Sequence, residues 1–230
     1  FENIDNLVKI TLENGLSLIV TKDHPLLNSE FKWKKSDELI IGDKIVVAYD
    51  LPNLTKNEIP LALARLLGFF ISEGSPNRKL KKVKDSTARQ RLRYFNKDSI
   101  LLNQVKEDLN IVAKYTSQIV KDKCSVVQAI PQEICQILNK KGISFGSKNY
   151  KLFVPEIILK SSNIIQREFL KALFSGEGIV SSQTDQIEYY SNSKRLLEEV
   201  AYLLYQEGIA CKIKPELLIL NNKIFSHYRL

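Results

Sequence analysis

Two nine-residue stretches decide the fold of this 230-residue chain. Residues 66–74 read LLGFFISEG, and residues 170–178 read LKALFSGEG. Both stretches place apolar residues at helical spacing and both end in Glu-Gly. A glycine after a helix end is common, so a single copy would mean little. Two copies with similar flanks indicate an internal repeat.

The flanking sequence repeats as well. Residues 94–102 resemble residues 189–197, since both begin with Tyr and a second aromatic residue and continue through a polar stretch into an apolar run. The Glu-Gly pairs are 104 residues apart (73 to 177), whereas these segments are 95 apart (94 to 189). The first repeat therefore carries about nine more residues, 104 minus 95, and the basic segment NRKLKKVKD at residues 77–85 has about that length.

Each repeated helix carries two small residues four positions apart, and such residues share one helix face. The pairs are Gly68 with Ser72 and Ala172 with Gly176. Small residues at this spacing let two helix backbones approach closely. We expect the helices to pack through these faces, which would bring their last residues, Glu73 and Glu177, side by side.

The chain divides into parts of different character. Residues 1–50 are β-prone, and two runs at 7–12 and 16–21 flank Asn14-Gly15, a strong hairpin signal. A turn at 41–44 precedes a predicted strand at 45–49. We predict a β segment at 1–50, a linker at 51–60, a first repeat at 61–160 and a second at 161–230.

After residue 60, helical spacing and β-prone runs alternate, which predicts an α+β fold. Helices are predicted at residues 99–109, 131–140, 164–175 and 194–207. Strands or β-prone runs are predicted at residues 86–96, 117–128, 150–154, 186–190, 210–220 and 224–230.

Composition narrows the class of protein. The net charge of +8 favours a polyanionic partner such as nucleic acid. Three widely spaced cysteines fit neither a disulfide framework nor a zinc site, which indicates a reducing, intracellular setting. There is no apolar run of about 18 residues, so we expect no membrane span. The chain contains no Met, so we interpret Phe1 as a cut or processed end.

A basic region lies between the two parts of the first repeat. Arg89, Arg91 and Arg93 alternate along a predicted strand and so share one face, which could read phosphates and guanine edges. A solvated edge strand is the alternative. The preceding basic residues, also predicted to bind DNA, are Arg78, Lys79, Lys81, Lys82 and Lys84. The equivalent face of the second repeat is polar but not basic, with Ser182, Gln183, Gln186 and Glu188. We therefore expect the two repeats to recognise the two halves of a DNA target by different contacts.

Both nine-residue stretches resemble the LAGLIDADG motif of homing endonucleases, with Glu in place of the commoner Asp. The resemblance covers residues 60–230. It implies a pseudo-twofold αββαββα fold in which two antiparallel sheets form a saddle over DNA. It also implies a monomer that cuts both strands of a long, asymmetric double-stranded DNA target.

The same resemblance implies a metal-dependent centre. Glu73 and Glu177 would hold Mg²⁺, with Mn²⁺ as an alternative, and the backbone carbonyls of Ser72 and Gly176 could add ligands. Lys151, in YKLFVP at residues 150–155, resembles a lysine segment of intein endonucleases and would orient water or offset charge. A solvated lysine at a strand start is the alternative. Its counterpart in the second half stays open among Lys212, Lys214, Lys223 and Arg229.

Residues 18–25, LIVTKDHP, resemble the Thr-x-x-His block of intein splicing (Hint-like) domains, and residues 39–44 resemble the segment that follows. The resemblance implies that Thr21 and His24 polarise the scissile amide of a host protein that flanks the intein. A turn histidine packed on Pro25 is the alternative for His24. We expect no splicing from the chain as given, because Phe1 is not a nucleophile and no His-Asn pair precedes Leu230.

The sequence thus favours an intein-encoded, site-specific DNA endonuclease. Two alternatives remain. One is a decayed or maturase-like nucleic-acid-binding protein on the same scaffold, and the other is a protein that is mainly a splicing element.

Overall fold

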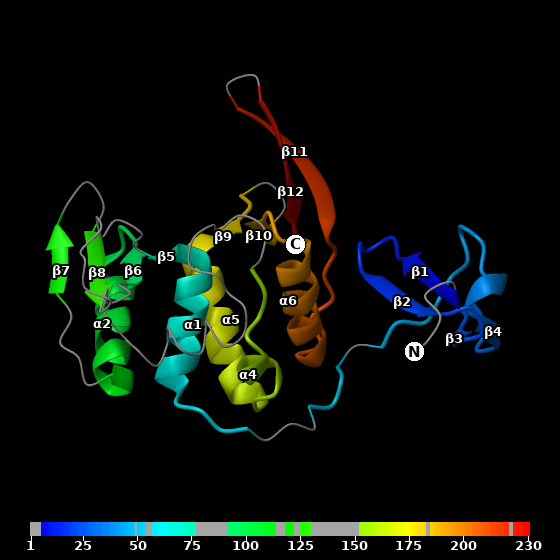
Figure 1. Cartoon of the computed structure of the whole chain (residues 1–230), viewed down its shortest axis with the longest axis horizontal. Helices are drawn as coiled ribbons and strands as arrows, with labels where there is room; N and C mark the ends of the chain where they lie inside the picture. Colours follow the sequence, from blue (N-terminus) through cyan, green and yellow to red (C-terminus); the bar gives the residue numbers. More distant parts are fainter. Residues whose placement is uncertain are drawn as a thin grey trace, which may run out of the picture.

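The computed structural model shows a mixed α+β chain with a β-rich N-terminal part and two helix-and-sheet units (Figure 1). The structure describes residues 6–48, 50–53, 57–76, 92–113, 118–121, 125–129, 152–182, 185–220 and 223–230. The predicted basic segment 77–85, the start of the predicted strand 86–96 and the predicted helix 131–140 lie outside these residues.

The N-terminal part is built from two short hairpins. Strands β1 (Leu7–Thr11) and β2 (Ser17–Thr21) pair antiparallel around the predicted turn, where Gly15 has φ +84°. Strands β3 (Pro25–Leu27) and β4 (Trp33–Lys35) form the second hairpin, followed by the 3-10 turn η2 (Ser36–Glu38). The predicted strand at 45–49 is wrong over the described residues 45–48: Ile45 makes an isolated bridge to Asn28, and no ladder continues from it. Two backbone hydrogen bonds flank this bridge, from Ser29 to Lys44 and from Val46 to Leu27, but residues 47 and 48 form no strand, and β propensity depends on a continuous partner.

The two units have the same order of elements. The first unit runs α1 (Leu61–Glu73), β5 (Gly74–Pro76), β6 (Leu92–Phe95), α2 (Ser99–Ala113), β7 (Gln118–Lys121) and β8 (Ser125–Ala129). The second runs α5 (Asn163–Glu177), β9 (Gly178–Val180), β10 (Ile187–Ser191), α6 (Lys194–Gln206), β11 (Lys214–Leu220) and β12 (Lys223–Arg229). Both sheets are antiparallel, with strand orders β5-β6-β8-β7 and β9-β10-β12-β11. A short helix, α4 (Glu156–Leu159), precedes α5.

Most of the predicted elements that fall on described residues are confirmed, and a second exception joins the one at residues 45–48. The predicted strand at 150–154 is wrong where the structure describes it, because residues 152–154 form no strand. Instead, the Val154 N–H donates to the Glu199 carboxylate at 2.6 Å, and the Leu152 carbonyl accepts from the Ser193 hydroxyl at 2.6 Å. Side chains of the α6 region satisfy this backbone, so it needs no ladder.

Helices α1 and α5 lie side by side at the centre of the molecule (Figure 1). Leu66 and Leu67 of α1 and Phe169 and Leu173 of α5 are completely buried. A Cβ on Gly68 would lie 2.5 Å from the Phe169 carbonyl oxygen and 3.0 Å from the Ala172 Cβ. The predicted packing through Gly68 and Ala172 is therefore confirmed, and the helix backbones approach too closely for a larger residue at 68.

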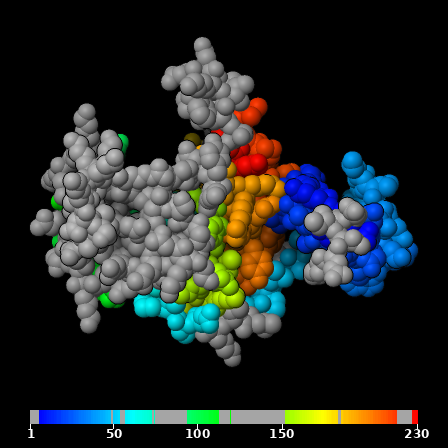
Figure 2. Space-filling model, in the orientation of Figure 1, coloured from blue at the N-terminus to red at the C-terminus, as the bar shows by residue number. Residues whose placement is uncertain are grey.

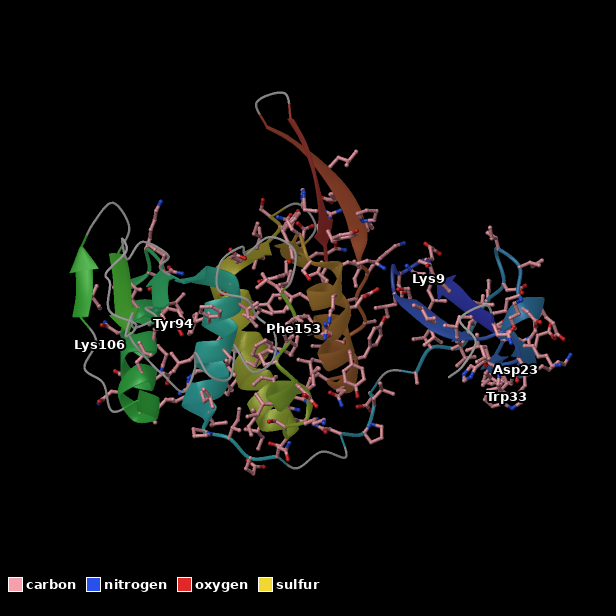
Figure 3. The ribbon with its side chains drawn as sticks, viewed as in Figure 1. Lys9, Asp23, Trp33, Tyr94, Lys106 and Phe153 are labelled. Carbon is pink, nitrogen blue, oxygen red and sulfur yellow. The ribbon has the colours of Figure 1, made fainter. Side chains whose placement is uncertain are left out.

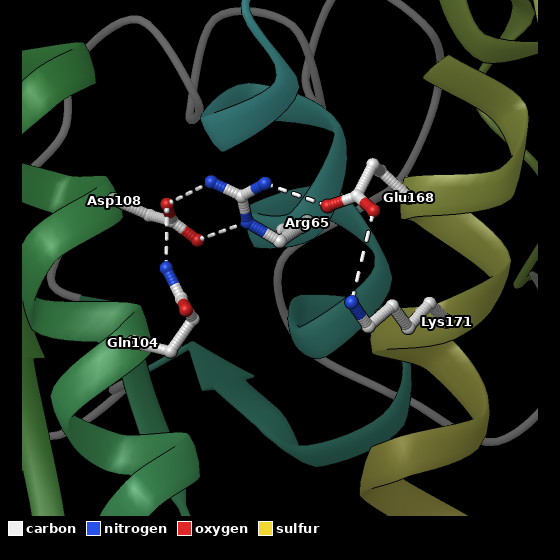
Figure 4. A network of polar contacts seen from close by, with 5 residues as sticks. All are labelled: Arg65, Gln104, Asp108, Glu168 and Lys171. Atoms are coloured by element: carbon white, nitrogen blue, oxygen red, sulfur yellow. Dashed lines mark hydrogen bonds and ion pairs between the residues drawn. The ribbon is translucent and has the colours of Figure 1, made fainter. Parts of the chain in front are cut away.

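A buried ion network ties three helices together (Figure 4). Arg65 of α1 makes a bidentate contact with Asp108 of α2, at 2.6 and 2.9 Å, and a 2.6 Å contact with Glu168 of α5. Asp108 is fully buried and also accepts from Gln104. Burial raises the pKa of the Asp108 carboxyl, while its hydrogen bonds to Arg65 lower it. The network therefore depends on the guanidinium to keep a desolvated carboxylate charged.

Replacing Gly68 by Ala should destabilise the protein. The gain in helix propensity is about 1 kcal/mol, but the added methyl group must move the α5 backbone, and overpacking of this kind costs about 1–3 kcal/mol. We expect a lower denaturant midpoint for Gly68→Ala and a still lower one for Gly68→Val. The control is Ser175→Ala on the exposed side of α5, and equal midpoints for both alanine variants would contradict the close contact.

Arg65→Met should cost about 3–5 kcal/mol at pH 7, because it leaves Asp108 buried without its cation. The pKa of Asp108, already raised by burial, rises further without Arg65. The variant should thus come nearest to wild-type stability below pH about 3.9, where the unfolded carboxyl is also protonated, and lose it as pH rises. Urea unfolding from pH 3.5 to 7 measures this. Lys160→Met, which removes an exposed pair with Glu156, is the control, and a pH-independent cost for Arg65→Met would refute the mechanism.

Candidate functional site

The two central helices end in the same way. Glu73 and Glu177 are the last helical residues, and the N–H groups of Gly74 and Gly178 donate to carbonyls four residues earlier. Both glycines have extended backbones, with φ and ψ of −74° and 141° for Gly74 and −70° and 142° for Gly178. A Cβ on either would lie 2.4 Å from the carbonyl oxygen that accepts its N–H. Glycine is therefore required here by lack of space and not by a positive φ.

A strand begins at each of these glycines. Gly74 pairs with Tyr94 across β5 and β6, and Gly178 pairs with Tyr189 across β9 and β10. Both tyrosines are 1% exposed. Tyr94 lies against α1 (Figure 3), where its hydroxyl donates to the Leu66 carbonyl. The rings of Tyr189 and Phe174 pack edge to face, with their centroids 5.4 Å apart. The alignment of Tyr94 with Tyr189 in the sequence repeat thus holds in the register of both sheets.

The helix ends lie on the same side of the helix pair. Gly68 and Ala172 touch, and each precedes its terminal Glu by five residues. At 1.5 Å per residue both ends lie about 7.5 Å beyond this contact. Figure 1 shows β5 and β9 leaving α1 and α5 at the same end. Glu177 is exposed there, whereas the Ser72 side chain is buried with its hydroxyl 3.2 Å from the Gly68 carbonyl oxygen.

The second sheet carries a polar network on the face away from the helices. Because Tyr189 is buried against the helices, its neighbours Glu188 and Tyr190 lie on the other face. Arg229 contacts Glu188 at 2.9 Å and Glu216 at 2.8 Å, and the Tyr190 hydroxyl donates to Glu188 at 2.8 Å. This hydrogen bond raises the pKa of the Tyr190 phenol. His227 lies 3.6 Å from Glu216.

The corresponding positions of the two sheets differ in charge. The match of Tyr94 with Tyr189 makes Arg93 the counterpart of Glu188. Arg93 directly precedes Tyr94 on β6. It pairs in register with Ser75 of β5 and Gln128 of β8. Other predicted DNA-binding residues, Arg78, Lys79, Lys81, Lys82, Lys84, Arg89 and Arg91, and also Lys151, lie outside the described residues.

Four basic residues were candidates for the second centre, and they lie in different places. Lys212 pairs with Glu13 of the N-terminal part at 2.8 Å. Lys223 starts β12, six residues from Arg229 along the strand, or about 20 Å at 3.4 Å per residue. Arg229 of β12 pairs in register with Tyr190 of β10 and with Lys214 of β11. The strand β10 separates Arg229 from β9, which begins at Gly178, and β10 and β12 together separate Lys214 from it. Arg229 and Lys214 are therefore nearest in register to the helix end.

Three members of the polar network escaped the sequence analysis: Tyr190, Glu216 and His227. The alternation of residues in the strands around Glu188 and Arg229 could have indicated them. It shows that these residues share one face only when β10, β12 and β11 are known to be neighbours.

An open groove of about 730 Å³ borders this sheet, lined by β10, the end of α6 and the ends of β11 and β12. Cys211 lines it and is half-buried. Burial raises the pKa of the Cys211 thiol to about 11. At neutral pH this side chain is a thiol and not a thiolate nucleophile or metal ligand.

Thr21 and His24 lie in the N-terminal part, and Figure 3 shows their neighbour Asp23 at the side away from the two units. The His24 N–H donates to the Thr21 carbonyl at 3.1 Å, and buried Ser36 donates to the same carbonyl. A hydrogen bond from the Thr21 side chain lowers the pKa of Asp23. Thr21, Asp23 and His24 thus form one tight turn, with His24 exposed.

Within the described ranges, no helix is both long and apolar enough to cross a membrane. In the same part of the chain, no three His, Cys, Asp or Glu side chains gather as a ready metal cluster.

Comparisons with known proteins found matches to the chain. Residues 165–227 match a family described as LAGLIDADG-like domain. A crystal structure of a variant of the homing endonuclease I-DmoI, in complex with its target DNA and in the presence of Mn, is similar with a TM-score of 0.48 and 20% identity, covering 74% of this chain and 87% of that one.

Two relatives come from Methanocaldococcus jannaschii. The replication factor C small subunit is 29% identical over 98% of this chain, and transcription initiation factor IIB is 26% identical over 88%. This chain spans 12% and 27% of those proteins, respectively.

In a Cys124→Ser/Cys135→Ser background, the Cys211 thiol should react slowly with a disulfide reagent. With a pKa of about 11 it is about 0.1% thiolate at pH 8, against about 24% for a free cysteine of pKa about 8.5. The rate should rise about tenfold per pH unit until pH about 11. A rate that levels off near pH 9 in folded protein would show that burial does not govern this thiol, and the same reaction in denaturant is the control.

Proposed function

We propose that this chain is an intein-encoded, site-specific homing endonuclease that cuts both strands of DNA. One observation carries the proposal: two helices of the same motif pack through Gly68 and Ala172, and each ends in Glu immediately before a sheet strand. Two equivalent carboxylates on one side of a helix pair suit a substrate with two equivalent scissile strands.

The residues at the helix ends fit a divalent cation. Glu73, Glu177 and the carbonyls of Ser72 and Gly176 form an oxygen-only donor set, which Mg²⁺ prefers and Mn²⁺ accepts. Helix C-termini carry the negative end of the helix dipole, and this also favours a cation. The bound ion supplies charge stabilisation and a more acidic water for phosphodiester hydrolysis. Each carboxylate would serve one strand, and Lys151 would offset charge near the first.

The sheets would bind DNA unequally. The first unit contributes Arg89, Arg91, Arg93 and the basic segment 77–85, whose charge suits phosphates and guanine edges. In the second sheet, Glu188 and Glu216 balance Arg229 and Lys214, so this face suits hydrogen bonding to bases more than attraction to phosphates. An asymmetric target, bound by a single chain, follows from this difference.

The relatives support an intein setting. Replication factor C small subunit and transcription initiation factor IIB are different proteins, yet nearly the whole of this chain matches a minor part of each. A module that recurs inside different proteins behaves as an insertion. The Thr21–His24 turn in the N-terminal part fits a splicing domain that a host protein would flank.

The test is cleavage of a randomised duplex DNA library with Mg²⁺ or Mn²⁺. We expect one discrete double-strand cut, and a loss of about 100-fold or more in rate for Glu73→Gln and Glu177→Gln with DNA binding retained, because each removes a charged ligand. Glu156→Gln, which removes the charge of a carboxylate paired with exposed Lys160 on α4, is the control and should cut normally.

Other results would separate the alternatives. Salt-sensitive binding without cutting by wild-type protein would favour a decayed or maturase-like binding protein. If the protein neither binds nor cuts DNA, the endonuclease and the binding-protein hypotheses are both contradicted. The hypothesis of a protein that is mainly a splicing element would then remain.

A further inference from the structure

The turn of the first hairpin packs against the segment that leads into β11. The Ile213 N–H donates to the Asn14 carbonyl at 2.6 Å. The Asn14 amide donates to the Tyr205 hydroxyl at 3.1 Å, and this hydroxyl lies 3.3 Å from the Cys211 carbonyl oxygen. In Figure 2 the blue N-terminal part lies directly against the orange part of the chain. Residues 199 positions apart (14 and 213) and 191 positions apart (14 and 205) thus share backbone and side-chain hydrogen bonds.

Gly15 brings the two backbones into direct contact. Its φ of +84° lies in the left-handed region, and a Cβ would lie 2.0 Å from the Ile213 carbonyl oxygen. Gly42 gives an internal comparison, since it has φ +102° but a Cβ there would meet nothing within 4 Å. Both glycines serve turns, but Gly15 also serves a contact between distant parts of the chain.

Charged pairs surround this contact. Lys212 pairs with Glu13 at 2.8 Å, and Ser17 and Lys194 both contact Glu198 at 2.8 Å. The Lys212–Glu13 pair is exposed, and such pairs contribute little to stability, while the Lys194–Glu198 pair lies within α6. The position of the turn is therefore set mainly by the Asn14 and Gly15 contacts.

The contact leads directly to the polar face of the second sheet. Ile213 is 2% exposed, and the next residue, Lys214, begins β11. Lys214 pairs in register with Arg229, which contacts Glu188 and Glu216. A turn that fixes Ile213 thus fixes the end of β11 at which this polar network lies.

We propose that the Asn14-Gly15 turn is a positioning element for the second sheet. The N-terminal part holds the start of β11 and so sets the geometry of the face that carries Lys214, Glu188 and Arg229. The DNA consequence rests on the proposed function: the N-terminal part tightens binding to one half of the target without touching it.

The experiment compares Gly15→Ala with Gly42→Ala in the full chain. Both put a side chain at a positive φ, but Gly15→Ala alone pushes on Ile213. We expect amide hydrogen exchange in residues 209–217 to be about tenfold faster in Gly15→Ala, with exchange in α1 and α5 unchanged. Tyr205→Phe, which removes one hydroxyl, should act in the same direction and keeps the test valid if Gly15→Ala unfolds the hairpin.

Footprinting on the target DNA gives the second readout. Gly15→Ala should lose protection on the half bound by the second sheet and keep it on the other half, whereas a general loss of stability would weaken both. Equal exchange and equal footprints in Gly15→Ala and Gly42→Ala would overturn the proposal. Wild-type protein that binds no DNA would contradict the proposed function, while the exchange data would still decide whether the turn positions β11.

Discussion

The close approach of α1 and α5 at Gly68 and Ala172 is the constraint on which the rest depends. A wider helix pair would separate the ends of the helices and the strands that begin there. Because Gly74 and Gly178 leave no turn between helix and strand, the helix contact also sets where each sheet starts. The backbone positions of Glu73 and Glu177 are therefore a consequence of helix packing, and they do not depend on a loop.

The repeat and its register could be read from the sequence because they are local. Glu-Gly after a helical run is a pattern within one segment, and so is a tyrosine followed by a second aromatic residue and an apolar run. The Arg65 network could not be read in this way. Asp108 lies 43 residues from Arg65 in the sequence. The sequence alone does not distinguish a buried aspartate on α2 from a solvent-exposed one. The predicted strand at residues 152–154 was wrong for the same reason. Side chains of Glu199 and Ser193, which are distant in sequence, form hydrogen bonds with that backbone.

In the candidate site too, local sequence patterns predicted some residues, whereas contacts between distant residues could not be predicted. Glu73 and Glu177 were predicted from the motif, and the arginines of the first unit were predicted from their alternation along an expected strand. The polar network of the second sheet did not, because Glu188, Glu216 and Arg229 lie on three strands whose order the sequence does not state. In that network each charge has a partner. The face can therefore exchange internal hydrogen bonds for contacts with base edges, whereas a face of arginines attracts phosphates whatever the bases are.

Among the described residues, hydrogen bonds join the N-terminal part and the linker to the rest of the chain at several places, three of which involve the backbone. The Asn14-Gly15 turn contacts Ile213, the Asp50 N–H donates to the Tyr205 carbonyl, and the Asn53 side chain donates to the Ser161 carbonyl. A linker that only spaced two independent parts would need none of these contacts. Tyr205 takes part in two of them, through its hydroxyl and its carbonyl, so the end of α6 is where the β-rich part and the second sheet meet. An independent domain would keep its surface free of such contacts, whereas the Asn14-Gly15 turn shares hydrogen bonds with the residue that precedes β11 and with the end of α6.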